Sequence, residues 1–311
     1  MIYVEMLGRM GNQMFSYAFA RKLQLQIKRQ QKSKIAFDFS KVAQDWSTEL
    51  TEFVCDDNII LQERKLCLLQ RAALYLYFRR RNRLAVYDEV SVMKLEEKWQ
   101  LFLNLFGIYL CSFNFHKFWP NPLFKNLLVL GFYESPAFFE DIDQLLQEEF
   151  SLKEKNNSDS VQQLVNQVVN CESVCVAVRR GDFESSGLRD FCSVCNEQYF
   201  FKAIKQMKEV QDNSKFFFFS DDIEWVRTKL AESEECVIVD PRSFGLSPAK
   251  QFQIMVQCKH FIISNSTYIW WTQHLCRNPE KKVIAPTRWR NFSMETHTGI
   301  YEKQWILVDP D

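Results

Sequence analysis

Residues 174–182 read Val174-Cys175-Val176-Ala177-Val178-Arg179-Arg180-Gly181-Asp182, an apolar run that ends in two arginines and an aspartate. Five consecutive small or β-branched residues are typical of a strand that is buried on both faces of a parallel sheet. Ligands of open α/β sheets bind beyond the carboxyl ends of the strands. The stretch therefore predicts an α/β fold in which Arg179 and Arg180 face an anionic ligand. The alternative is an Arg-Asp pair that only holds a loop in place.

Strands and helices alternate through the rest of the second half. Strands are predicted at 216–219, 237–239, 260–263 and 282–285, and helices at 197–209, 223–230, 248–256 and 267–275. Repeated β-α units imply a parallel sheet wrapped by helices. With the polar stretch 153–160 as a linker, residues 153–311 are predicted to form a C-terminal Rossmann-like domain.

The start of the chain also predicts a parallel sheet. Residues 2–7 form a predicted strand, Gly8-Arg9-Met10-Gly11 a turn, 12–27 a helix and 34–39 a second strand. This β-turn-α-β order opens many parallel sheets. Residues 1–152 are therefore predicted to form an N-terminal α/β domain, which gives the protein two α/β domains with a ligand cleft.

The composition narrows the class of protein. The formal net charge is +0 over 311 residues, which argues against nucleic acid as a partner and favours a small anionic ligand. Several of the ten cysteines lie in apolar patterns, so we expect free thiols. A zinc cluster of Cys171, Cys175, Cys192 and Cys195 is disfavoured because Cys175 lies in the buried strand. The charged start of the chain predicts neither a signal peptide nor a membrane anchor, and we expect an intracellular protein.

Two segments of the first half allow more than one interpretation. Residues 61–84 predict a helix that ends in Phe78-Arg79-Arg80-Arg81-Asn82-Arg83, and residues 99–119 predict a buried helix. Polar residues interrupt the second segment, so it contains no uninterrupted apolar stretch long enough to span a bilayer. The alternative is that the basic and apolar helices rest together on an anionic membrane surface.

Polar side chains follow three further predicted strand ends. Arg9 and Asn12 follow the first strand, Asp221 and Asp222 follow 216–219, and Ser264, Asn265, Ser266 and Thr267 follow 260–263. Four hydrogen-bonding side chains before a helix exceed what a cap needs, so we predict a phosphate site there. Asp221 is a predicted acceptor for a base or ribose and Asp222 a predicted helix cap, while Asn12 could instead cap its own helix. Together these segments suit a nucleotide diphosphate.

Four segments, in this order, resemble the inverting α-1,2-fucosyltransferases of bacteria. They are Gly8-Arg9-Met10-Gly11-Asn12-Gln13-Met14-Phe15, Arg179-Arg180-Gly181-Asp182, Phe219-Ser220-Asp221-Asp222, and Ser264-Asn265-Ser266-Thr267 with Trp270-Trp271. The resemblance extends over nearly the whole chain. It implies a GT-B-like fold, with the N-terminal domain on the acceptor side and the C-terminal domain binding GDP-fucose. It further implies transfer of L-fucose from GDP-β-L-fucose to a galactose-containing oligosaccharide or glycolipid, with no metal or other cofactor, in the bacterial cytoplasm.

The resemblance and the residue patterns together assign roles to residues. Arg179 matches the motif arginine that binds the diphosphate, and Arg9, Asn12, Arg180, Asp221, Ser264, Asn265, Ser266 and Thr267 are the predicted donor-binding set. Asp182 is the predicted base, with Glu134 and Glu184 as alternatives. Ala177 stands where the family motif has a histidine, so a catalytically weak sugar-nucleotide or glycan-binding protein is the second interpretation. A Rossmann oxidoreductase is a third, although the three-glycine dinucleotide fingerprint is absent.

Overall fold

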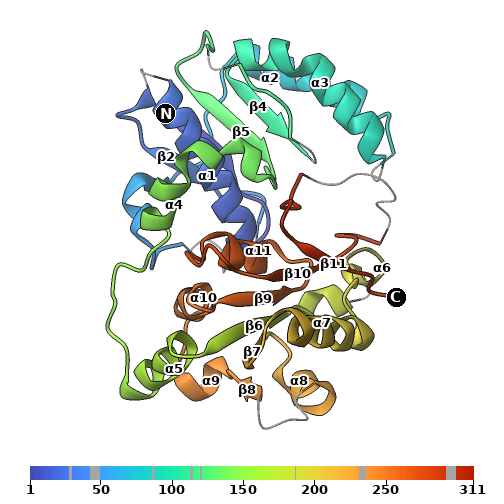
Figure 1. Cartoon of the computed structure of the whole chain (residues 1–311). Helices are drawn as coiled ribbons and strands as arrows, with labels where there is room; N and C mark the ends of the chain where they lie inside the picture. The colour runs from blue at the N-terminus through green and yellow to red at the C-terminus, as the bar shows by residue number, and fades with distance from the viewer. Residues whose placement is uncertain are drawn as a thin grey trace. The chain divides into compact units, whose positions relative to one another are not determined.

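The computed structural model describes residues 1–27, 30–42, 50–85, 88–112, 115–119, 121–185, 187–230, 236–291 and 299–311. The chain divides into two compact units, Met1–Ser151 with Thr296–Ile300 and Leu152–Glu295 with Tyr301–Asp311. Each unit is built on its own parallel sheet (Figure 1). None of the described helices is long and apolar enough to cross a bilayer.

Unit 1 contains a five-stranded parallel sheet in the order β3-β2-β1-β5-β4. The strands are β1 (Ile2–Glu5), β2 (Ile35–Asp38), β3 (Ile59–Leu61), β4 (Ile108–Cys111) and β5 (Leu127–Gly131), and the helices are α1 (Met10–Gln26), α2 (Leu68–Arg81), α3 (Glu89–Leu105) and α4 (Asp143–Glu149). Ala73, Tyr77 and Leu103 pack α2 and α3 onto one face of the sheet. Aromatic residues of α1, such as Phe19 against Tyr109, pack on the opposite face.

Two predictions for this unit are wrong in part. The predicted buried helix at 99–119 ends at Leu105, and Ile108–Cys111 forms strand β4. The predicted helix at 61–84 begins only at Leu68, because Ile59–Leu61 pairs with β2 as strand β3. A short apolar run is compatible with either a buried helix or a buried strand. Pairing with a neighbouring strand, which periodicity does not reveal, decides between them.

Unit 2 contains a six-stranded parallel sheet in the order β11-β10-β9-β6-β7-β8. The strands are β6 (Glu172–Val178), β7 (Ser214–Ser220), β8 (Cys236–Ile238), β9 (His260–Ile263), β10 (Val283–Pro286) and β11 (Ile306–Val308), and the helices are α5 (Asp159–Val169), α6 (Arg189–Cys192), α7 (Glu197–Val210), α8 (Ile223–Lys229), α9 (Pro241–Phe244), α10 (Pro248–Val256) and α11 (Thr267–His274). Counted from its first strand, this is the 3-2-1-4-5-6 order of a Rossmann fold.

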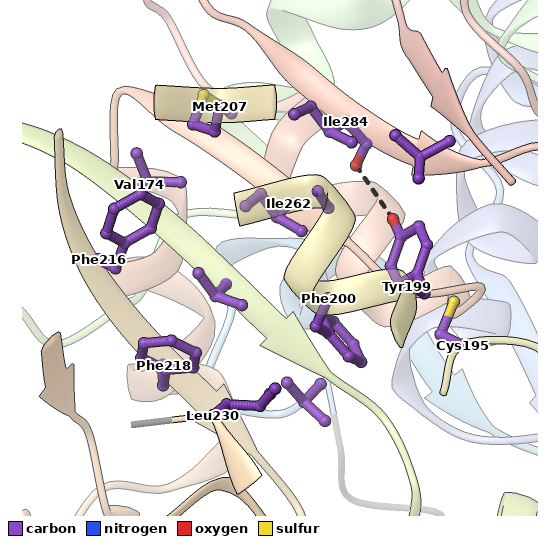
Figure 2. Packing of buried hydrophobic residues seen from close by; sticks show 14 of the residues in the cluster. Val174, Cys195, Tyr199, Phe200, Met207, Phe216, Phe218, Leu230, Ile262 and Ile284 are labelled. Atoms are coloured by element: carbon purple, nitrogen blue, oxygen red, sulfur yellow. Dashed lines mark hydrogen bonds between the residues drawn. The ribbon is translucent and has the colours of Figure 1, made fainter. Parts of the chain in front are cut away.

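The core of unit 2 follows from the alternation of side chains along β6. Val174 and Val176 belong to the buried cluster on the face where α7 packs. Figure 2 shows Val174 in this cluster with Phe216 and Phe218 of β7 and Met207 of α7. Tyr199 of α7 is fully buried, and its hydroxyl lies 3.5 Å from the carbonyl oxygen of Ile284. The same hydroxyl donates to the carbonyl of Ile263, the last residue of β9. The first turn of α7 is therefore fastened to the carboxyl end of β9.

A buried carboxyl group lies under α3 in unit 1. Glu96 is 2% exposed, and its two oxygens accept the backbone N–H of Ser112 at 3.1 and 3.2 Å. Burial raises the pKa of Glu96 to about 7. The folded state therefore holds a proton on this carboxyl at a pH where the unfolded chain has already released it.

This difference makes stability depend on pH. We expect the free energy of unfolding to fall as the pH rises from about 4.5 to 7, because over this range the unfolded chain ionises Glu96 while the folded state keeps the buried carboxyl protonated. Glu96→Gln keeps an acceptor for Ser112 but cannot ionise. Between pH 4 and pH 8, the wild type should lose about 3 kcal/mol relative to this variant. Urea unfolding of both proteins at the two pH values measures the difference, and a constant difference would contradict the prediction.

Candidate active site

The strand order of unit 2 reverses between β6 and β9, which are adjacent in the sheet. In doubly wound sheets, ligands bind in the crevice beyond the strand carboxyl ends at this switch point. Arg179 and Arg180 follow β6 there, Asp221 and Asp222 follow β7, and residues 264–267 follow β9. Three of the predicted segments are thus brought to the carboxyl ends of three neighbouring strands.

Arg179 lies at the centre of a charged cluster just beyond β6. Its Nη2 donates to Asp182 Oδ1 at 2.6 Å, and its Nη1 lies 2.7 Å from Asp221 Oδ2. A guanidinium carries five N–H donors, so at least three remain beyond these contacts. The side chain is 22% exposed. Two carboxylates hold the guanidinium in one orientation while leaving donors for a further anion.

Asp221 ties the arginine loop to β7. Its Oδ1 accepts the backbone N–H of Arg180 at 2.9 Å while its Oδ2 pairs with Arg179. A Cβ atom on Gly181 would lie 2.5 Å from Oδ2, so only glycine allows this approach without movement of the carboxylate. Asp221 therefore orients both arginines. Its contact with a base or ribose stays a prediction.

Arg180 packs against α8. Its Cζ lies 4.3 Å from the centre of the Trp225 ring, and its Nε donates to Asp222 Oδ2 at 3.3 Å. Asp222 Oδ1 accepts the backbone N–H of Trp225 at 3.1 Å, which confirms the predicted helix cap. Trp225 contributes a cation–π contact that the sequence patterns did not indicate. The one local sequence signal for this contact is the position of Trp225, three residues after the capping Asp222.

The polar junction after β9 divides into two kinds of residue. Ser264 Oγ donates to the carbonyl of Ala177 at 3.0 Å and accepts the N–H of Arg179 at 3.1 Å. Asn265 Nδ2 donates to the carbonyls of Cys192 and Trp289, both at 2.9 Å. These two side chains are thus engaged with the protein's own backbone. Ser264 holds the end of β9 against the arginine loop, and Asn265 holds it against the segments of Cys192 and Trp289.

Ser266 is the N-cap residue of α11, and its side chain makes no capping hydrogen bond. The first turn of α11, which begins at Thr267, contains no acidic residue. Backbone N–H groups and the helix dipole at such an end favour an anion. Ser266 and Thr267 therefore remain the residues of this junction best suited to a phosphate.

The predicted loop of unit 1 also begins a helix without a side-chain cap. Arg9, not Asn12, is the N-cap residue of α1, and the Arg9 side chain makes no capping hydrogen bond. Gly8 has φ +68°, and a Cβ there would overlap the Asn12 amide and lie 3.1 Å from Asn12 Cγ. The alternative in which Asn12 caps the helix is therefore wrong. The glycine turn instead leaves room for the Asn12 side chain.

The three predicted bases lie in different surroundings. Asp182 is bound to Arg179, and Glu184 accepts from Ser193 Oγ at 2.7 Å and lies 3.5 Å from Arg180. Glu134 of unit 1 is 6% exposed and follows Tyr133, whose φ is +55°. A bulky residue in that conformation is strained, and such strain is concentrated at functional sites. Asp182 stays the predicted base, with Glu134 and Glu184 as the alternatives.

The cysteines and histidines do not form a metal centre within the described ranges. All ten cysteines are free thiols, and no group of three or more His, Cys, Asp and Glu side chains is arranged to hold a metal in that part of the chain. His116 bonds to the carbonyl of Leu110, and His260 and His274 pair with Glu172 and Glu302. His297 lies outside the described residues.

Comparison with known proteins shows the family to which the chain belongs. The profile of glycosyl transferase family 11 matches residues 1–309. The chain therefore belongs to glycosyltransferase family 11. As the sequence predicted, it is an α/β protein with two Rossmann-like units, of the kind that GT-B glycosyltransferases contain.

Three curated relatives are similar to the chain. The O-antigen biosynthesis glycosyltransferase WbnK of Escherichia coli is 24% identical and covers 98% of this chain and 99% of its own length. An α-1,2-colitosyltransferase of Escherichia coli is 28% identical over 58% of this chain and 62% of its own. The mouse galactoside 2-α-L-fucosyltransferase Sec1 is 29% identical over 33% of this chain and 28% of its own. The protein is thus a glycosyltransferase related to α-1,2-fucosyl- and colitosyltransferases.

Proposed function

We propose that this protein transfers L-fucose from GDP-β-L-fucose to the 2-hydroxyl of a galactose-containing oligosaccharide or glycolipid, with inversion and without a metal ion. The observation that carries the proposal is the position of Arg179 at the β6–β9 switch point, held by two carboxylates with donors to spare. Family membership supports the reaction class. All ten thiols are free, which suits a reducing compartment such as the bacterial cytoplasm.

In this mechanism the acceptor oxygen bonds to the anomeric carbon as the bond from that carbon to the β-phosphate oxygen breaks. GDP departs with the electron pair, and the acceptor proton passes to a carboxylate. The guanidinium of Arg179 stabilises the charge that develops on the departing diphosphate. Arg179 thereby takes the role that a divalent cation has in other transferases. Ser266, Thr267 and the N-terminus of α11 contribute further donors to the phosphates. Arg9 and Asn12 of unit 1 stay predicted donor-binding residues.

Colitose is a second candidate for the transferred sugar, because one relative is an α-1,2-colitosyltransferase. A screen of GDP-sugars against β-galactosides, with the product linkage assigned by NMR, tests both donors. We expect turnover with GDP-fucose, an α-1,2 product and an unchanged rate after treatment with EDTA. Binding of GDP-fucose with no transfer to any galactoside would instead favour a sugar-nucleotide-binding protein. Loss of rate with EDTA that added metal restores would overturn the metal-independent mechanism.

Asp182→Asn separates the base from its partner arginine. If Asp182 takes the acceptor proton, kcat should fall by about a hundredfold. GDP should bind about fivefold more tightly, since one of the carboxylates that compete with the diphosphate for Arg179 has lost its charge. Single-turnover kinetics and calorimetry with GDP measure the two effects. A fall in kcat with Glu134→Gln but not with Asp182→Asn would move the base to Glu134.

A further inference from the structure

The outer faces of α2 and α3 are unusually apolar for a surface of unit 1. The two helices lie side by side on one face of the sheet (Figure 1). Their inner faces supply Ala73, Tyr77 and Leu103 to the core. Their outer faces carry large apolar side chains, with Leu68 81%, Tyr75 66% and Leu101 51% exposed. Such a face requires an explanation, because surface helices normally turn polar residues outward.

Six exposed apolar residues lie at one end of the helix pair, while Tyr75, Leu76 and Phe78 continue the apolar face along α2. The Gln70 amide, on the first turn of α2, donates to the carbonyl of Phe106 at 3.0 Å, so the start of α2 lies against the end of α3. The backbone N–H of Leu123 donates to the carbonyl of Leu105 at 2.9 Å, and the backbone N–H of Trp119 donates to Asn104 Oδ1 at 2.9 Å. We call this end the apolar patch, and it consists of Leu68, Leu69, Leu101, Leu105, Trp119 and Leu123, all of them exposed.

Exposed cations lie along the same two helices, with Arg71 beside the apolar patch and the others farther from it. Arg79, Arg80 and Arg83 lie at the end of α2 or just beyond it, and Lys94 and Lys98 lie on the exposed side of α3. Helix α2 has no acidic residue, and Glu97 is the acidic residue that α3 exposes. Within the described residues, Arg79, Arg80 and Arg83 form no ion pair. We call Arg79, Arg80, Arg83, Lys94 and Lys98 the basic patch.

We propose that the apolar and basic patches together bind the surface of an anionic lipid membrane. A bilayer interface accepts exposed leucines and a tryptophan into its apolar boundary and neutralises arginines and lysines with its headgroups. Nucleic acid would neutralise the basic patch but leave Leu68 and Leu123 in water. A second copy of the chain would cover the leucines but supply no carboxylates from α2. The inference concerns this face alone and does not depend on the proposed donor or acceptor.

Flotation of the full chain with lipid vesicles tests the charge term. We expect binding to vesicles of phosphatidylcholine mixed with phosphatidylglycerol at low salt, and much weaker binding to phosphatidylcholine alone or at high salt. The triple variant Arg79→Gln, Arg80→Gln, Arg83→Gln should lower the partition coefficient by about a hundredfold. The matched control Lys155→Gln, Lys205→Gln, Lys303→Gln removes three exposed charges from unit 2 and should bind as the wild type does.

The apolar term needs a second pair of variants. Leu68→Ser with Leu123→Ser should weaken vesicle binding by at least about tenfold. Val169→Ser with Leu307→Ser, two residues of unit 2 with 41% and 44% exposure, should not change it. All four proteins change exposed residues, and thermal unfolding checks that each remains folded.

Several results would overturn the inference. One is equal loss of binding in both charge variants, which would indicate general electrostatic attraction. Another is absence of vesicle binding while a single-stranded oligonucleotide binds and the arginine variant abolishes it. A third is a dimer that the Leu68 and Leu123 variant dissociates while vesicles do not bind the wild type. None of these results requires transferase activity, so they leave the proposed function to its own test.

Discussion

Arg179→Ala should lower kcat/KM for GDP-fucose by about a thousandfold. The guanidinium lies beyond β6 with Asp182 and Asp221 on either side, and no other cation is bound between those two carboxylates in the described residues. Its removal takes away the charge that stabilises the leaving diphosphate and leaves two carboxylates facing an anion. The loss should appear mainly in kcat, because charge on the diphosphate is greatest in the transition state.

Two further variants make this test specific. Arg179→Lys keeps the charge but loses the planar fork of donors, and we expect it to recover only part of the rate. Arg227→Ala removes an exposed arginine from α8 that pairs with Asp240 at 3.4 Å, and it should leave the rate unchanged. Since the ion pairs of Arg179 are partly exposed, the free energy of unfolding should change by less than about 1 kcal/mol. Turnover of Arg179→Ala close to that of the wild type would remove Arg179 from the mechanism.

Gly131→Ala should destabilise the protein by at least about 4 kcal/mol. Gly131 ends β5 with φ +109°, a conformation that side-chain-bearing residues rarely adopt. A Cβ there would overlap the carbonyl oxygen of Cys111 and lie 2.7 Å from its carbonyl carbon. Since Cys111 and Gly131 are paired across β4 and β5, both strands would have to move.

Two other glycines provide a graded comparison. Gly245 has φ +60° with no atom within 4 Å of a Cβ, so Gly245→Ala should cost about 1 kcal/mol from backbone conformation alone. Gly187 has neither a positive φ nor a nearby atom, and Gly187→Ala should be close to neutral. Urea unfolding measures the three variants. Equal costs at Gly131 and Gly245 would mean that the contact with Cys111 relaxes freely.

Much of unit 2 was predictable from local patterns. The run of small and β-branched residues before Arg179 indicates a buried strand, and the structure has β6 there. Predicted elements such as the helix at 248–256 occur as α10 with the same bounds. In unit 1 the patterns were less informative. Ile108–Cys111 is apolar in a region of helical periodicity, and it becomes β4 only by pairing with β5.

The candidate site was predictable as a set of residue types, but not in its detailed roles. Polar side chains that follow several strands indicate the edge of the sheet at which a ligand binds. Ser264 and Asn265, however, look no different in sequence from Ser266 and Thr267. In the structure the first two bind the backbone of β6 and of neighbouring loops. Those partners lie 24 to 87 residues away along the chain, so no local pattern could have distinguished the two pairs.

The amino-acid sequence alone thus determined the α/β class, the family and the charged end of β6, because strand burial and glycine turns depend on neighbouring residues. Tertiary structure decided the strand order, the orientation of Arg179 by Asp182 and Asp221, and the union of apolar and basic residues on α2 and α3. These features depend on contacts between distant segments. Such contacts form only when the sheet orders its strands, and the order of strands is set by the packing of the whole unit rather than by any one stretch of sequence.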